Sequence, residues 1–118
     1  MSGRAATAAR ARPIDGVFRA LSDPTRRNVL ERLSRSPGSV TELAAPFDMA
    51  LPSFLEHLRI LEGCGLVRSK KIGRVRIYQL MPRRLKLAED WLTRRRAFWE
   101  RRLDRLDAYL LDLKEKTP

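Results

Sequence analysis

The most informative part of this chain is residues 39–80, which read SVTELAAPFDMALPSFLEHLRILEGCGLVRSKKIGRVRIYQL. Ser39 followed three residues later by Glu42 predicts a helix start, because the two side chains can accept from backbone N–H groups that a first helical turn leaves unpaired. Leu43 gives this short helix an apolar side, and Pro46 ends it.

A second helix is predicted over residues 51–62, where apolar residues recur at helical spacing. Gly63 and Gly65 follow, and glycine tolerates the left-handed backbone with which helices commonly end. We expect one set of residues to face inward and a polar set to lie nearer the solvent. The inward set is Phe54, Leu55, Leu58 and Leu61, and the polar set is Ser53, Glu56, His57 and Arg59.

Two β-like runs come next, residues 66–71 and 74–80, joined around Ile72 and Gly73. With the two helices they predict a winged helix-turn-helix, whose second helix is shaped to enter a DNA groove beside a basic hairpin, the wing. The expected fold class is mainly α, with a small β-hairpin wing and, over residues 82–118, a long C-terminal dimerisation helix.

Two further helices are predicted before this segment. Apolar spacing of i, i+3, i+4 and i+7 marks the first, and Ser22-Asp23-Pro24 gives the second a cap followed by proline in its first turn. The inward residues are Ile14, Val17, Phe18 and Leu21 in the first helix, and Val29, Leu30 and Leu33 in the second.

Residues 1–13 hold three arginines and no acid. We expect a mobile tail there, with a basic arm in a minor groove as the alternative.

Residues 82–114 are predicted to form one long helix, and a break near Asp90 is left open. Apolar residues repeat every seven positions along it and form a seam, which is continuous only in the second half. A helix of about 30 residues extends roughly 45 Å, more than a small domain easily covers, so we infer a second copy of the chain. The alternative is that both tryptophans fill a core within one chain. The seam residues are Leu85, Leu92, Trp99, Leu106 and Leu113, joined by Leu103 and Leu110.

The charge of the chain favours a polyanionic partner. Lys and Arg total 25 against 14 Asp and Glu, a net charge of +11, which suits nucleic acid or an anionic membrane surface. Residues 14–65 hold six arginines and seven acids, whereas residues 66–81 hold five basic residues and no acid. Basic side chains on a hairpin can reach phosphates. Alternatively, they only discourage pairing between exposed strand edges.

Several function classes are excluded. No apolar run approaches the roughly 20 residues of a membrane span, and the N-terminus lacks the apolar region of a signal peptide. One cysteine makes no internal disulfide, which fits the cytoplasm. Neither a nucleophile motif nor a Gly-rich phosphate loop is present, so we expect no enzymatic activity, no catalytic residue and no cofactor.

Five motifs occur in the order typical of one bacterial family. They are LSDPTR (21–26), TELA (41–44), HLRILE (57–62), GLV (65–67) and the segment from GR to YQL (73–80). On these motifs the chain resembles the ArsR/SmtB family of transcriptional repressors, most closely its members without metal-binding cysteines. The resemblance covers about residues 14–80 and, more loosely, the terminal helix. It implies a dimeric winged-helix protein that binds operator DNA and releases it on a signal.

The resemblance also implies an organisation and a dimer interface. We expect a basic tail over residues 1–13, a DNA-binding domain over 14–81, and a C-terminal helix over 82–118 in the same structural domain. Family members dimerise through their first and last helices, and two recognition helices then read half-sites about one DNA turn apart. The interface residues expected here are Ile14, Val17, Phe18, Trp91, Trp99, Leu103, Leu106 and Leu110.

The recognition helix departs from the family pattern, because Ala50, Leu51, Leu55 and Glu56 stand where polar or basic residues are common. Leu51 can contact a thymine methyl, and Glu56 can accept from cytosine, so base readout is expected to be sparse. The expected DNA contacts are Leu51, Pro52, Ser53, Glu56, His57 and Arg59 in this helix, Arg68, Lys70, Lys71, Arg74 and Arg76 in the wing, and Thr41, Arg26 and Arg27 elsewhere. Arg26 and Arg27 either touch phosphate or pair with acids such as Asp23.

His57 is favoured as a DNA-proximal residue, with a structural role as the alternative. No metal site is expected, because the helix that carries cysteines in metalloregulatory relatives reads VTELAA (40–45) here and the terminal helix has no histidine. Cys64 is either a redox switch or, more commonly for a lone cysteine, a small buried residue.

We therefore predict a homodimeric, metal-independent repressor that binds an inverted repeat in double-stranded DNA, with no membrane association and an unknown effector. The alternative is a protein-interaction module that acts through the terminal helix and binds nucleic acid only weakly and non-specifically. A third possibility is RNA binding through the wing.

Overall fold

A computed structural model describes residues 12–116, so the predicted basic tail falls almost wholly outside the described residues. The described chain forms two units, one ending at Ala88 and the other beginning at Glu89. None of its helices is long and apolar enough to cross a membrane. The elements are α2 (Pro13–Leu21), α3 (Pro24–Leu33), β1 (Gly38–Ser39), α4 (Val40–Ala44), α5 (Leu51–Gly63), β2 (Val67–Ile72), β3 (Val75–Leu80) and α6 (Pro82–Lys116).

The predicted helix starts are confirmed by their caps. The Asp23 side chain accepts from the backbone N–H of Arg26 at 3.1 Å, and Pro24 opens α3. At α4, the Ser39 hydroxyl accepts from the Glu42 N–H, and the Glu42 carboxylate accepts from the Ser39 N–H, both at 3.2 Å. Each cap satisfies donors that the first turn of a helix leaves unpaired, which is why these short sequences start helices.

The end of α5 depends on Gly65, which adopts a φ of +80°. The Gly65 N–H donates to the Glu62 carbonyl and the Leu66 N–H to the Leu61 carbonyl, both at 3.1 Å. These two bonds form a Schellman motif, and it requires a left-handed residue at Gly65. The chain therefore turns sharply from α5 into the wing.

The predicted hairpin is confirmed as β2 and β3, which pair antiparallel from Val67 opposite Leu80 to Ile72 opposite Val75. Gly73, with a φ of +64°, and Arg74 form the loop between them. A third strand, β1, pairs with the other edge of β3 and gives the sheet order β1-β3-β2. This strand was not predicted from the sequence, because two residues are too few for an alternating pattern.

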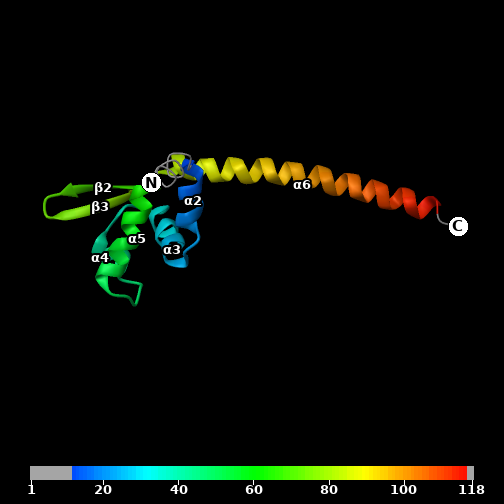
Figure 1. Cartoon of the computed structure of the whole chain (residues 1–118). Coiled ribbons are helices and arrows are strands. Elements are labelled where there is room, and N and C mark those ends of the chain that lie inside the picture. The colour runs from blue at the N-terminus through cyan, green and yellow to red at the C-terminus, as the bar shows by residue number, and fades with distance from the viewer. Residues whose placement is uncertain (1–11, 117–118) are drawn as a thin grey trace, which may run out of the picture. The chain divides into compact units, whose positions relative to one another are not determined.

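The core lies where α3, α4 and α5 gather on one side of the hairpin (Figure 1). Phe54, Leu58 and Leu61 are buried along α5 as predicted, but Leu55 is not, since 38% of its surface is exposed. One residue step rotates a side chain by about 100°, which turns Leu55 out of the face that its neighbour Phe54 occupies. The other buried apolar residues of this unit are Val17, Ala20, Val29, Leu30, Leu33, Leu43, Leu66, Val67, Tyr78 and Ala88.

The terminal helix is helical throughout Pro82–Lys116, with no break at Asp90. Its part from Glu89 onward would extend about 42 Å at 1.5 Å per residue. Large apolar side chains are exposed along that part, and Trp99 is 59% exposed.

Candidate nucleic-acid interface

Helices α4 and α5 are joined by a turn that is anchored by aromatic contact. The rings of Phe47, in the turn, and Phe54, in α5, lie 5.5 Å apart between centroids at an angle of 53°. Tilted pairs at this distance are favourable beyond the area they bury. Because Phe54 is fully buried, this contact fixes the approach of the chain to the start of α5.

The first half of α5 presents an exposed face. Leu51 is 53% exposed, and Pro52, Ser53, Glu56 and Arg59 are exposed as well. The Arg59 guanidinium lies 3.2 Å from the Glu56 carboxylate. This ion pair offsets the negative charge of Glu56 on the exposed face. The residues predicted for the recognition helix thus share a solvent-facing surface, with the exception of His57.

His57 is half-buried and belongs to a polar cluster with Arg26 and Asp23. Its Nδ1 lies 3.1 Å from Arg26 Nη1 and 3.7 Å from Asp23 Oδ2. Since a guanidinium only donates, Nδ1 accepts, and the ring proton sits on Nε2. His57 thereby presents a donor at its other nitrogen. The cluster gives His57 a structural role, and its contact with DNA stays a prediction.

Burial raises the pKa of the Asp23 carboxyl, but the hydrogen bond from the Arg26 N–H and the positive charge of Arg26 outweigh it. The pKa of Asp23 is therefore lowered from its ordinary value. A carboxylate that caps α3 and lies beside the Arg26 guanidinium stays ionised, because both interactions favour the charged form.

Arg26 is used inside the fold rather than presented to phosphate. Only 8% of its surface is exposed, and its side chain donates to the Ala20 carbonyl at 2.8 Å and the Arg19 carbonyl at 3.0 Å. These are carbonyls at the end of α2, where helical partners run out. Arg26 is accordingly removed from the expected DNA contacts. Its neighbour Arg27 is exposed and donates to the Leu21 carbonyl at 2.7 Å.

The wing divides its basic residues between two faces. Residues directly opposite in an antiparallel pair share a face, so Lys71 and Arg76 lie together, whereas Lys70 lies with Ile77 on the other side. Arg76 Nη1 also donates to the Ser69 hydroxyl at 2.9 Å. All five basic side chains of the wing are exposed, Arg68, Lys70, Lys71, Arg74 and Arg76, as is Thr41 at the start of α4.

The residues predicted for a dimer interface fall into three groups. Val17 is fully buried in the core of its own chain, so its place in an interface is corrected. Ile14 and Phe18 are half-buried. The remaining five lie exposed on the second unit: Trp91, Trp99, Leu103, Leu106 and Leu110.

Within residues 12–116, no three His, Cys, Asp or Glu side chains gather closely enough to hold a metal ion. Cys64 is half-buried, and its Sγ donates to the Leu61 carbonyl at 3.3 Å. That the chain binds DNA without a metal stays a prediction.

Residues 21–70 match the model of a helix-turn-helix domain. The HTH-type transcriptional regulator Rv2034 of Mycobacterium tuberculosis is 38% identical over 89 residues, covering 75% of this chain and 80% of that protein. The transcriptional repressor SdpR of Bacillus subtilis is 30% identical over 79 residues, covering 67% and 88%. A crystal structure of an ArsR family transcriptional regulator is 49% identical, covers 75% of this chain and 98% of that one, and superposes with a TM-score of 0.72.

This chain belongs to the ArsR family.

The family resemblance drawn from five motifs is thus confirmed, and with it the winged helix-turn-helix fold. This ArsR family member is a DNA-binding transcriptional regulator, a class of protein without enzymatic chemistry. The cluster of Asp23, Arg26 and His57 was not predicted from the sequence. Asp23 and Arg26 both stand in one family motif, but their distance of 31 residues or more from His57 left no local signal.

Proposed function

We propose that this ArsR family member is a homodimeric repressor that binds an inverted-repeat operator and needs no metal to do so. The observation that carries the proposal is the exposed first half of α5, which follows a turn fixed by the buried Phe54. Ser53 can donate to or accept from a base edge, and Leu51 can contact a thymine methyl. The Nε2–H of His57 adds a donor. Readout by so few polar groups is expected to be sparse.

Phosphate contacts supply the rest of the affinity in this proposal. The basic side chains of the wing are exposed, as are Arg27 and Thr41. They can contact phosphates and so position α5 without reading bases. Arg74→Ala with Arg76→Ala should weaken binding on all sequences and reduce the salt slope by about one unit for each phosphate that is no longer neutralised. Arg94→Ala with Arg101→Ala removes the same charge from α6, on the side away from its apolar seam, and should leave the slope unchanged.

The second copy is argued from the seam of α6. Leu103, Leu106, Leu110 and Leu113 follow heptad spacing and are all exposed in the single chain. An apolar seam of this length is stabilised when a second helix covers it. Leu110 and its neighbour Leu111 provide a matched pair of positions, because they are 52% and 62% exposed but only Leu110 lies on the seam.

Sedimentation tests the dimer with that pair. Leu110→Glu together with Leu103→Glu should give a monomer, whereas Leu111→Glu should remain a dimer. A dimer that survives the double seam substitution would remove the basis for the second copy.

Selection from a random double-stranded DNA library tests the readout, using reduced, metal-free protein. We expect an inverted repeat with half-sites about one turn apart, preferred over scrambled DNA by about 10³ or more. Binding that is salt-sensitive but blind to sequence would refute the operator proposal. It would favour the second candidate, a protein-interaction module, for which the exposure of Leu51 and Leu55 is the supporting observation.

A further inference from the structure

A cavity of about 670 Å³ opens beside the end of α5. Its volume lies within the range of small-molecule pockets. Apolar groups line part of it, including the side chains of Ile60 and Cys64 and the bare backbone of Gly16. A Cβ at Gly16 would lie 3.4 Å from the Cys64 Cβ, so the absence of a side chain there helps to keep the space open.

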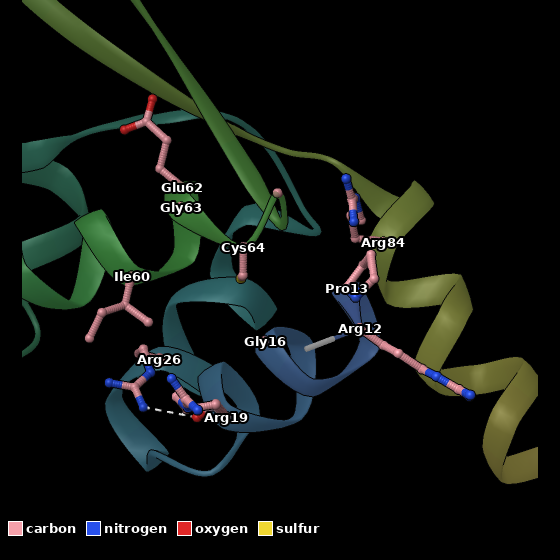
Figure 2. A pocket seen from close by; sticks show the side chains of 11 residues that line it. Arg12, Pro13, Gly16, Arg19, Arg26, Ile60, Glu62, Gly63, Cys64 and Arg84 are labelled. Carbon is pink, nitrogen blue, oxygen red and sulfur yellow. Dashed lines mark hydrogen bonds between the residues drawn. The ribbon is translucent and has the colours of Figure 1, made fainter. Parts of the chain in front are cut away.

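Guanidinium groups gather around the same cavity. Figure 2 shows Arg19 and Arg26 toward one end of the lining and Arg84 toward the other, while the Glu62 side chain points away. Glu62 instead accepts from the Ser69 hydroxyl at 2.7 Å. Glu62 is the one carboxylate among the lining residues, and Asp23 lies beside Arg26, so the uncompensated positive charge of the rim belongs to Arg19 and Arg84.

The charges of Arg19 and Arg84 have no partner among the residues that the structure describes. Among residues 12–116, neither guanidinium takes part in an ion pair or a side-chain hydrogen bond. Arg84 lies next to Gly65 at the cavity, since a Cβ built at Gly65 would lie only 3.0 Å from the Arg84 Cγ. Guanidinium groups with free donors bind carboxylates well, because two parallel N–H groups match the two oxygens.

We propose that this cavity binds a small amphipathic carboxylate, with its head group on Arg19 or Arg84 and its apolar tail against Ile60 and Cys64. Carboxylate binding is a function in addition to the proposed DNA recognition, and it does not depend on that recognition. The position suits an effector, because Arg26 lines the cavity and its Nη1 also contacts His57 Nδ1 on α5 at 3.1 Å. A ligand that alters this contact would change DNA affinity, and DNA would change ligand affinity by the same factor.

Titration of the DNA-free protein with octanoate, followed by ¹H–¹⁵N correlation spectra, tests the proposal. Five described glycines serve as reporters. Gly16, Gly63 and Gly65 line the cavity, and Gly38 and Gly73 lie outside it. We expect saturable shifts at the first three and none at the other two. Acetate, which lacks the tail, and 1-octanol, which lacks the charge, should each bind about tenfold more weakly or worse.

Arg19→Gln with Arg84→Gln should weaken octanoate binding about tenfold or more, with spectra otherwise like those of the parent. The control, Arg94→Gln with Arg101→Gln, removes equal charge from α6 and should bind octanoate as the parent does. If the double variant does not fold, Arg19→Gln and Arg84→Gln are made singly, and at least one of them should show the loss. Equal binding of 1-octanol, unchanged affinity in the arginine variants, shifts confined to residues 89–116, or no saturation would each overturn the proposal. None of these results bears on DNA binding, which is measured without octanoate.

Discussion

The two adjacent arginines of α3 should respond very differently to the same substitution. Arg26→Met keeps the length and apolar packing of the side chain but removes every donor. Arg26 Nε donates to the Ala20 carbonyl at 2.8 Å, and that carbonyl has no helical donor four residues later because Pro24 lacks an N–H. The substitution therefore leaves a buried acceptor without its charged partner.

The cost follows from what each acceptor retains. The Arg19 carbonyl keeps two donors from Ser22, the N–H at 3.2 Å and the hydroxyl at 2.6 Å. The loss consequently falls on the Ala20 carbonyl, with a smaller part at His57. A hydrogen bond to a charged group contributes about 1.5–3 kcal/mol, so we expect a loss of about 2–3 kcal/mol. For a domain of this size that lowers the melting temperature by about 10–20 °C.

Arg27→Met is the matched control. Its guanidinium is exposed and makes one bond, to the Leu21 carbonyl, which water can replace. We expect a cost of about 0.5 kcal/mol or less. Both variants are compared with the parent by urea unfolding, followed by far-UV circular dichroism, at one protein concentration, since dimerisation would link stability to concentration.

The result that would refute this reasoning is specific. If Arg26→Met costs no more stability than Arg27→Met and instead lowers the salt slope of DNA binding, then Arg26 contacts phosphate. In that case the hydrogen bonds from Arg26 to the Arg19 and Ala20 carbonyls would contribute little to the stability of the fold.

Three further predictions concern stability. Asp23→Asn keeps the cap of α3 but removes its charge. Because the pKa of Asp23 is lowered from 3.8 in the folded protein, the parent should lose stability more steeply than the variant as pH falls through about 4. A series of urea titrations at different pH values measures this difference. Gly65→Ala should destabilise the fold by about 1–2 kcal/mol, since the φ of Gly65 is +80° and Arg84 lies close. Gly63→Ala, in open space at the end of α5, should be neutral or mildly stabilising in the same assay. Ser39→Ala should cost about 1 kcal/mol through loss of the α4 cap, measured by thermal unfolding.

Each of these has a contrary outcome. If the free energy of unfolding depends on pH equally in the parent and in Asp23→Asn, the neighbours of the Asp23 carboxylate do not stabilise its charged form. Equal stability of the two glycine variants would show that the turn after α5 tolerates a side chain. A neutral Ser39→Ala would mean that water replaces the cap without loss.

The sequence by itself determined the elements whose signals lie within a few residues. The Ser39–Glu42 cap, Pro24 after Asp23, and Gly65 after α5 act on the nearest backbone groups, so their effect can be read without knowing the fold. The seam of α6 is equally local, because heptad spacing alone aligns its leucines on one side. These elements occur in the structure where the pattern predicted them.

Only the tertiary structure decided which member of a similar pair faces inward. Phe54 and Leu55 are both apolar neighbours, as Arg26 and Arg27 are both basic, yet the first of each pair is buried and the second is exposed. The strand β1 and the contact between Arg26 and His57 likewise join residues that are far apart along the chain. Packing between elements sets the direction of each helix face, and it depends on distances that no local pattern contains.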